Sequence, residues 1–205
     1  MAQPARSRTR LDPAGRRRQL LDVGARLFAE RPYDLVSIEE IAVRAGVSRG
    51  LMYRYFATKR DLFRAVVQAT ADHMIDLTDP DPALPLEQQI LAGLDRYLDH
   101  FEANATLIRA AYTGAASADE HVRAIIADKA RRHEDRLLDR LRQAGVPETP
   151  RLRVALRGWI LMCRMLILDW LDTREISRTE LRDVCAQSLL DLAAHAGRQS
   201  TAAAP

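Results

Sequence analysis

The sequence predicts an all-α protein with an N-terminal three-helix head and a C-terminal helical bundle. Leu, Ala and Arg dominate the 205 residues, and all three residue types favour helix. Apolar residues recur at helical spacing along most of the chain, and no segment shows the alternation typical of a strand. Capping residues, prolines and glycines divide the chain into segments of helical length. Together these three observations predict helices alone.

The first predicted helix follows a basic N-terminal arm. Residues 1–11 contain three arginines and little that can pack, so we expect this arm to be disordered. Asp12 is a suitable N-cap, and Pro13 suits the first helical position. Apolar residues then follow at helical spacing until Pro32, which cannot continue a helix. This helix opens a head that we predict over residues 12–57.

Two short helices complete the predicted head. The run Ser37-Ile38-Glu39-Glu40 predicts a capping box, in which Ser37 accepts from the amide of Glu40 and Glu40 reaches back to the amide of Ser37. Gly46 ends this helix, because glycine readily adopts a positive φ. Ser48 caps the next helix, which ends near Phe56.

A connecting helix and a bundle make up the rest of the chain. Thr58 caps the connecting helix, predicted over 58–77, and three prolines in the segment 80–85 break the pattern beyond it. Residues 78–197 form the predicted bundle, and we expect a disordered tail at 198–205. The predicted bundle helices cover residues 86–103, 105–115, 119–143, 150–174 and 177–195.

The two short helices and their turn have the spacing of a helix-turn-helix. Ala42 is small where the helices approach, Gly46 occupies the turn, and Phe56 belongs to the apolar set that fixes the crossing angle. At the start of the second helix, Arg49 has the geometry to pair with guanine, and Leu51 is able to touch a thymine methyl group. The motif therefore predicts a helix that enters the major groove of DNA.

The distribution of charge agrees with a nucleic-acid partner at one end. Residues 1–66 carry 14 Lys and Arg against 7 Asp and Glu, whereas residues 67–205 carry 17 against 21. A basic third on an acidic remainder is typical of a chain whose one end meets a polyanion. Chance clustering of arginines is the alternative explanation of the charge alone.

The stretch SIEEIAVRAGVSRGLMYRYFATKRDLF resembles the TetR family of transcriptional regulators. It has the family's capped helix, A-G-V turn, serine-capped recognition helix, Y-x-Y-F cluster and a lysine at the start of the next helix. The resemblance is strong over residues 12–67 and covers only the architecture beyond them. It implies that Ser37, Tyr53 and Lys59 anchor phosphates.

The same resemblance identifies the residues that read DNA. Those implied to lie nearest the bases are Arg49, Gly50, Leu51 and Tyr55. Arg54 departs from the family pattern, and its role as base reader or phosphate clamp stays open. The complete set of predicted DNA-binding residues is Ser37, Ser48, Arg49, Gly50, Leu51, Tyr53, Arg54, Tyr55 and Lys59.

The resemblance also implies a ligand pocket in the bundle and a dimer interface on its last two helices. The helix predicted at 150–174 is apolar on more than one face, so it must bury more than one. A two-fold four-helix interface would bury both, and a purely internal core helix is the alternative. The predicted interface residues are Leu181, Val184, Cys185, Ser188, Leu189 and Leu192. The pocket candidates are Tyr97, Phe101, Leu107, Ile108, Tyr112, Trp159, Met162 and Met165, since apolar and aromatic groups line pockets.

Several polar residues in the bundle have simple expected roles. Arg164 interrupts an apolar run, so if buried it should pair with an acid across the dimer, which we favour, or hold an anionic ligand. The five histidines show no metal-ligand spacing, and solvated or capping roles suffice for them. Cys163 and Cys185 are predicted to be ordinary buried thiols.

These features predict a repressor that binds a pseudo-palindromic operator as a homodimer and is released by an apolar small molecule. Alternatives are a transcriptional activator and a non-specific nucleic-acid-binding helical protein. No enzyme, cofactor or metal site is expected, because the chain lacks a Gly-rich phosphate loop, paired Glu-x-x-His motifs and a nucleophile elbow. No membrane segment or signal peptide is apparent, so we expect a cytoplasmic protein.

Overall fold

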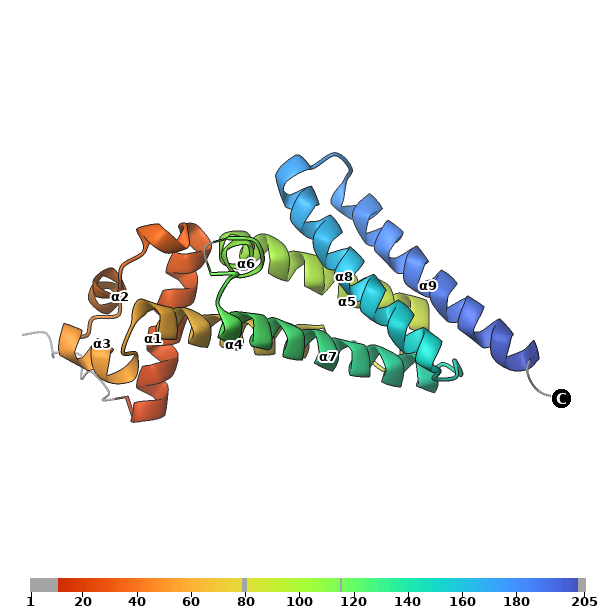
Figure 1. The fold of residues 1–205 in the computed structure, drawn as a ribbon, viewed down its shortest axis with the longest axis horizontal. Helices are drawn as coiled ribbons and strands as arrows, with labels where there is room; N and C mark the ends of the chain where they lie inside the picture. Colours follow the sequence, from red (N-terminus) through yellow and green to blue (C-terminus); the bar gives the residue numbers. More distant parts are fainter. Residues whose placement is uncertain (1–10, 79–80, 115, 203–205) are drawn as a thin grey trace, which may run out of the picture.

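The computed structural model describes residues 11–78, 81–114 and 116–202, with side chains up to residue 196. Within these ranges every regular element is a helix, as the sequence predicts (Figure 1). The short 3-10 helix was not predicted. The elements are α1 (Pro13–Glu30), η1 (Tyr33–Leu35), α2 (Ile38–Arg44), α3 (Arg49–Tyr55), α4 (Lys59–Leu77), α5 (Leu86–Ala103), α6 (Ala105–Tyr112), α7 (Glu120–Gln143), α8 (Pro150–Thr173) and α9 (Arg178–Ala202).

The head lies at one end of an elongated molecule (Figure 1). Helices α1, α2 and α3 and the first turns of α4 share one core, in which Phe28 packs edge-to-face on Phe63 with ring centroids 5.1 Å apart. Met52 and Phe56 are fully buried and hold α3 against the other helices. Gly46 has a φ of 65°, which provides the left-handed residue that the turn between α2 and α3 needs.

Local capping starts each helix of the motif. The Oγ of Ser37 accepts from the Glu40 amide at 3.0 Å, and Ser48 and Thr58 cap α3 and α4 in the same way. The second predicted hydrogen bond of the capping box, from the Ser37 amide to the Glu40 carboxylate, is wrong. Instead, Nη1 of Arg31 donates to both carboxylate oxygens of Glu40, at 2.7 and 2.9 Å. A charge-assisted contact outcompetes a backbone amide, and here it joins the end of α1 to α2.

Helix α4 carries the head into the body, where it packs along α7. The Asp119 carboxylate caps α7 and accepts from Nε of Arg64 at 3.0 Å, which ties the two helices together. Helix α6 contacts α1, and Leu107 and Ala111 of α6 belong to the core of the head. The head and body therefore meet through both α4 and α6.

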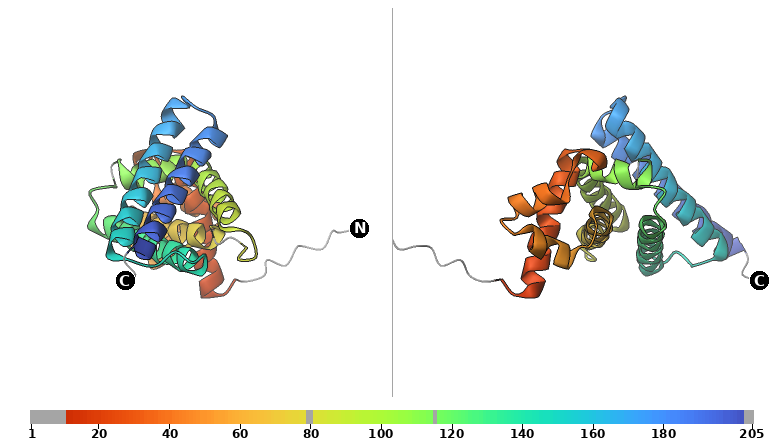
Figure 2. Two further views of the ribbon diagram at one scale, coloured as in Figure 1. Left: turned by 90° about the vertical axis from the view of Figure 1, so that its right-hand side faces the viewer. Right: turned by 60° about the vertical axis from the view of Figure 1, so that its left-hand side comes forward.

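Helices α8 and α9 form a hairpin that covers the body on the side away from the head (Figures 1 and 2). Nε1 of Trp159 on α8 donates to the Cys185 carbonyl and to the Ser188 hydroxyl of α9, each at 3.0 Å. Cys163 and Cys185 are buried and free, as predicted. Helices α8 and α9 pack on α5 and α7 and complete the core of the body.

Two predicted helix ends differ from the structure. Helix α6 ends at Tyr112 rather than near residue 115, and α9 continues to Ala202 rather than ending near His195. An isolated glycine costs a helix only about 1 kcal/mol, so Gly197 does not end α9. Residues 1–10 of the predicted arm and 203–205 of the predicted tail lie outside the described residues. In the described part of the chain, no helix has the length and apolar character to cross a membrane.

Candidate functional site

Helix α3 turns one side to the core of the head and the other outward. The Arg49 side chain is 73% exposed, and Tyr53 is 44% exposed. Of the predicted DNA-binding residues, those exposed are Ser37, Ser48, Arg49, Gly50, Tyr53 and Arg54, whereas Leu51, Tyr55 and Lys59 are half-buried. The first turn of α3 therefore presents an exposed arginine and an exposed glycine. Such a surface suits close approach to a polyanion.

A carboxylate of α2 orients two of these side chains. The Tyr53 hydroxyl donates to Oε1 of Glu39 at 2.8 Å, and Nη2 of Arg49 lies 3.4 Å from the same oxygen. The hydrogen bond from Tyr53 is the main cause that lowers the pKa of Glu39. Sequence reasoning named Tyr53 and Arg49 but missed Glu39, because only the crossing of α2 and α3 brings residues this far apart in sequence together.

Lys59 is directed to the backbone of the head. Its Nζ donates to the carbonyls of Tyr33 at 2.9 Å and Val36 at 3.0 Å, and it lies 4.3 Å from the Tyr33 ring centroid. These contacts hold the 3-10 turn that precedes α2. The family resemblance implied a phosphate anchor at this position, whereas the described contacts are structural.

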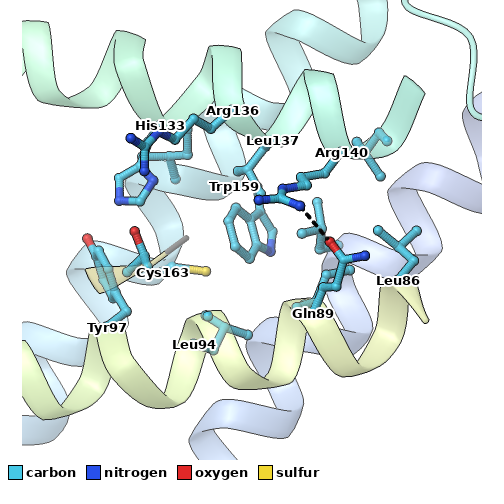
Figure 3. A pocket seen from close by; sticks show the side chains of 16 residues that line it. Leu86, Gln89, Leu94, Tyr97, His133, Arg136, Leu137, Arg140, Trp159 and Cys163 are labelled. Atoms are coloured by element: carbon cyan, nitrogen blue, oxygen red, sulfur yellow. Dashed lines mark hydrogen bonds between the residues drawn. The ribbon is translucent and has the colours of Figure 1, made fainter. Parts of the chain in front are cut away.

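A partly open cavity lies in the body between α5, α7, α8 and α9. Figure 3 shows Trp159 and Leu94 among its apolar walls. Tyr97 and His133 lie at one end of this cavity, and Gln89, which accepts from Nη1 of Arg140 at 3.3 Å, lies at the other (Figure 3). A mostly apolar cavity with a few polar groups in its lining is typical of a small-molecule site.

A smaller cavity lies nearer the head, between α4, α5, α6 and α7. Its polar lining includes Lys129 and His100, which are 6% and 5% exposed. Burial and the neighbouring Lys129 lower the pKa of His100 to about 3, so its imidazole is neutral. Burial, followed by Lys129 and two arginines, likewise lowers the pKa of His133 to about 3.

The predicted pocket residues divide into four groups. Tyr97 and Trp159 line the larger cavity, and Leu107, Ile108 and Tyr112 line the smaller one. Phe101 is fully buried and packs on Tyr97, with ring centroids 4.6 Å apart. The prediction is wrong for Met162 and Met165, which are 37% and 54% exposed because they lie on the outer face of α8.

Two histidines and a lysine of the cavities were missed by sequence reasoning. Solvated or capping roles were expected for all five histidines, and this is wrong for His100 and for His133, whose Nε2 is buried without a hydrogen-bond partner in the described residues. No sequence signal marks Lys129, because its helix is rich in charged residues on every side. Helix α7 turns that one lysine inward.

The predicted dimer interface on α9 also needs correction. Leu181, Cys185 and Leu189 are buried in the chain's own core, and Ser188 is bonded to Trp159. Leu192 is partly buried against the same core. Of the predicted set, only Val184 is largely exposed, at 53%. Exposed apolar side chains of α8, the other helix of the hairpin, include Leu161, Met162, Met165 and Leu166.

Arg164 turns toward a ring of its own chain. Its guanidinium carbon lies 4.8 Å from the Tyr112 ring centroid, and its Nε is buried without a hydrogen-bond partner among the described residues. Among the described residues no carboxylate forms an ion pair with it, and an acidic partner across the dimer stays a prediction.

The chain matches known families in both its parts. Residues 20–66 match the family described as bacterial regulatory proteins, tetR family. Residues 86–192, more than half of the chain, match the tetracyclin repressor-like C-terminal domain. A crystal structure of a tetR-family transcriptional regulator from Streptomyces coelicolor is 28% identical, with a TM-score of 0.82, and the match covers 95% of this chain and 92% of that one.

Curated relatives match over part of the chain. The transcriptional activator FasR of Mycolicibacterium smegmatis is 39% identical over 66 residues, which are 32% of this chain and 30% of that protein. The transcriptional repressor Rv1474c of Mycobacterium tuberculosis is 31% identical over 84 residues, which are 41% of this chain and 45% of that protein. The matched segments thus span less than half the length of these two relatives. The helix-turn-helix, the helical body and the two family matches together show that this chain belongs to the TetR family of bacterial regulatory proteins.

Proposed function

We propose that this chain is a homodimeric transcriptional repressor that binds a pseudo-palindromic operator and releases it when a small molecule occupies the body. The observation that carries the proposal is the outward-facing start of α3, with Arg49 exposed and Tyr53 beside it, in a chain of the TetR family. An exposed arginine at the start of a recognition helix is suited to guanine O6 and N7 in the major groove.

A homodimer would present two such helices. Support for it comes from the outer face of the α8–α9 hairpin, where five apolar side chains are between 36% and 54% exposed: Leu161, Met162, Met165, Leu166 and Val184. A contiguous apolar surface is typical of a protein interface, and two hairpins related by a two-fold axis form a four-helix contact. Two recognition helices about 34–36 Å apart would then read successive major grooves.

Ligand control is supported by how the cavities border α4. Thr78 at the end of α4 lines the larger cavity, and Val67, Thr70 and Ala71 of α4 line the smaller one. A molecule in the body would therefore contact the helix that carries the head. Release follows only if this molecule binds the DNA-free arrangement more tightly than the DNA-bound one.

The direction of control is proposed from the relatives that match, which include one named activator and several named repressors. We propose repression because repressors outnumber the activator among these relatives. In vitro transcription with and without the protein separates the two outcomes, since an activator raises the transcript level.

DNase footprinting of the promoters nearest the gene tests the proposal. We expect protection of an inverted repeat whose half-sites lie about one helical turn apart, or a multiple of it, and whose affinity falls steeply with salt. Light scattering of the free protein should give twice the chain mass. Protection of no inverted repeat, with equal affinity for random DNA at matched salt, would contradict the proposal.

A further inference from the structure

The body contains a cluster of basic and imidazole side chains that no carboxylate balances. Lys129 and His100 are at least nine-tenths buried and line the smaller cavity. His133 lies one helical turn after Lys129 and lines the larger cavity. The Nε2 atoms of both histidines are buried without a hydrogen-bond partner among the described residues. Neither cavity has an Asp or Glu in its described lining.

Aromatic rings surround the ammonium of Lys129. Its Nζ lies 5.5 Å from the ring centroid of Phe101, 5.8 Å from that of Tyr97 and 5.9 Å from that of Tyr112. A buried ammonium is normally paired with an acid, and aromatic faces replace only part of that stabilisation. The carboxylate of Asp72 on α4 is already bound to Arg132 at 2.7 Å.

A second cation approaches the same tyrosine. The guanidinium of Arg164 lies 4.8 Å from the Tyr112 ring centroid, and its buried Nε has no hydrogen-bond partner in the described chain. Two positive groups on one ring repel each other, and an anion between or beside them would relieve this repulsion. The cluster therefore contains two cationic side chains, and neither has a carboxylate partner in the described chain.

The two arginines that line the larger cavity, Arg136 and Arg140, are already engaged. Arg136 donates to the Ile75 carbonyl, and Arg140 donates to Gln89. Figure 3 shows Arg140 at the end of the cavity opposite Tyr97 and His133. The unbalanced positive charge thus lies at the Tyr97 end, where the larger cavity comes closest to Lys129.

We propose that the effector is an apolar molecule with one anionic group, such as a carboxylate, and that Lys129 and Arg164 bind this group. The apolar part would occupy the larger cavity against Leu94 and Trp159. Tyr97 lines that cavity, and its ring centroid lies 5.8 Å from Nζ of Lys129, so the proposed anionic group would lie beside Tyr97. The inference rests on the proposed ligand-responsive function and adds the chemical class of the ligand.

The protonation of Lys129 supports an anionic ligand. Burial, followed by Arg164 and Arg132, lowers the pKa of Lys129 to about 7. The remaining titratable groups against it are Tyr97 and His100 on α5, Tyr112 on α6 and His133 on α7, all of them neutral near pH 7 because burial raises the pKa of both tyrosines and lowers that of both histidines. An anion beside Lys129 would raise its pKa, so binding above pH 7 takes up a proton.

The position of Lys129 also connects the ligand to the head. The lining of the smaller cavity includes Lys129 and also Val67, Thr70 and Ala71 of α4. An anionic group held there would border the helix that carries the recognition helix. In this proposal the apolar part of the ligand provides affinity, and the anionic group lies against α4, the helix that must move to release DNA.

A matched pair of fluorescent probes tests the charge requirement. Anilinonaphthalene sulfonate and N-phenylnaphthylamine share an apolar skeleton and differ by the sulfonate. We expect the wild-type protein to bind the sulfonate about tenfold more tightly than the neutral probe at neutral pH. Equal affinity, or tighter binding of the neutral probe, overturns the proposal.

Variants assign the preference to Lys129. We expect Lys129→Met to remove most of the preference for the sulfonate while changing the affinity for the neutral probe less than about twofold. The matched control is Arg131→Met, which removes an exposed cation, 68% exposed, from the same helix. A Lys129→Met protein that keeps the full preference, or an Arg131→Met protein that loses it equally, overturns the assignment.

The wild-type chain offers a second readout that needs no variant. Lys59 and Lys129 are the two lysines of the sequence, so isotope-labelled lysine gives two side-chain signals in an NMR titration. We expect the sulfonate probe to shift the Lys129 signal and to raise its apparent pKa, and to leave Lys59 unchanged. A Lys129 signal unaffected by saturating sulfonate probe refutes the proposal.

These measurements need no DNA, so they fail or succeed apart from the proposed function. If footprinting finds no operator and the sulfonate preference persists, the anion site stands and the regulatory function falls. If an operator is found and the preference is absent, only the inference about the ligand falls. Release of the operator by the sulfonate and not by the neutral probe would support both.

Discussion

The hydroxyl of Tyr53 on α3 and the carboxylate of Glu39 on α2 are joined by a hydrogen bond of 2.8 Å. Arg49 also lies 3.4 Å from the carboxylate oxygen that accepts this bond. In the DNA-free chain, an acid therefore holds two residues of the proposed recognition surface. Because this acid is near the expected phosphates, it opposes binding through its charge while it fixes the side chains that bind.

Replacing Glu39 with Gln separates these two effects. The amide of Glu39→Gln still accepts from Tyr53 but carries no charge, so we expect affinity for random DNA to rise about threefold at low salt. Fluorescence anisotropy over a salt series measures this, and the gain should vanish at high salt. Glu87→Gln, an exposed acid of the body, is the control. An unchanged affinity at low salt would show that Glu39 lies away from the DNA.

We expect Lys59 to stabilise the folded head. Lys59→Met removes two hydrogen bonds to backbone carbonyls, so we expect the free energy of unfolding to fall by about 1–3 kcal/mol in urea titrations. The salt dependence of DNA binding should keep its slope, because no phosphate contact is lost. Normal stability with a slope reduced by about one would instead assign Lys59 to a phosphate.

We expect Arg49 to contact bases and Arg54 to contact the phosphate backbone. Arg49→Ala should weaken operator binding by about 1–3 kcal/mol and random DNA much less, because a bidentate contact with guanine is specific. Arg54 is exposed on the same helix, and Arg54→Ala should weaken operator and random DNA together and lower the salt slope by about one. Competition binding assays with both DNAs compare the two. The opposite pattern would exchange the two roles.

The buried Lys129 predicts an unusual dependence of stability on pH. Its pKa is lowered from an ordinary value of 10.5 to about 7 in the folded chain. Between pH 7 and pH 10.5 the unfolded chain binds the proton and the folded chain does not. The destabilisation of the folded chain by this lysine therefore grows as the pH falls from 10.5 to 7, and it is constant below pH 7. Lys129→Met should therefore stabilise the protein most at neutral pH and below, and least near pH 10.

Urea titrations across this pH range measure the difference between wild type and Lys129→Met. Arg131→Met again provides the control, because an exposed cation should give a small difference that is almost independent of pH. A difference for Lys129→Met that is flat from pH 7 to pH 10 would mean that Lys129 is charged throughout and has an anionic partner.

The exposed face of α8 should hold the proposed dimer together. Met165 is 54% exposed, and Met165→Glu would place two like charges close to a two-fold axis in a low-dielectric contact. We expect light scattering to show monomers at concentrations where the wild type is dimeric. Leu35→Glu, at an apolar residue of the head that is 63% exposed, should remain a dimer. Dissociation by both variants, or by neither, would place the interface elsewhere.

The sequence by itself determined the head. Asp12, Ser37, Ser48 and Thr58 are N-caps, and each acts on amides two or three residues away, so their effect needs no distant partner. Gly46 fixes the turn for the same local reason. The outward residues of α3 followed from its short apolar face. The error at Glu40 came from Arg31, whose approach depends on how α1 crosses α2.

Only the tertiary structure decided the faces of the body. The periodicity of α9 marks Leu181 and Leu189 as apolar, but it does not tell whether they meet a partner or their own core, and the structure buries both. Met162 and Met165 were expected in a pocket and lie outside for the same reason. Lys129 shows the limit most clearly, since a lysine among charged residues reads as exposed. It is buried because α5, α6, α7 and α8 converge on it, and that convergence is a property of packing between segments far apart in the chain.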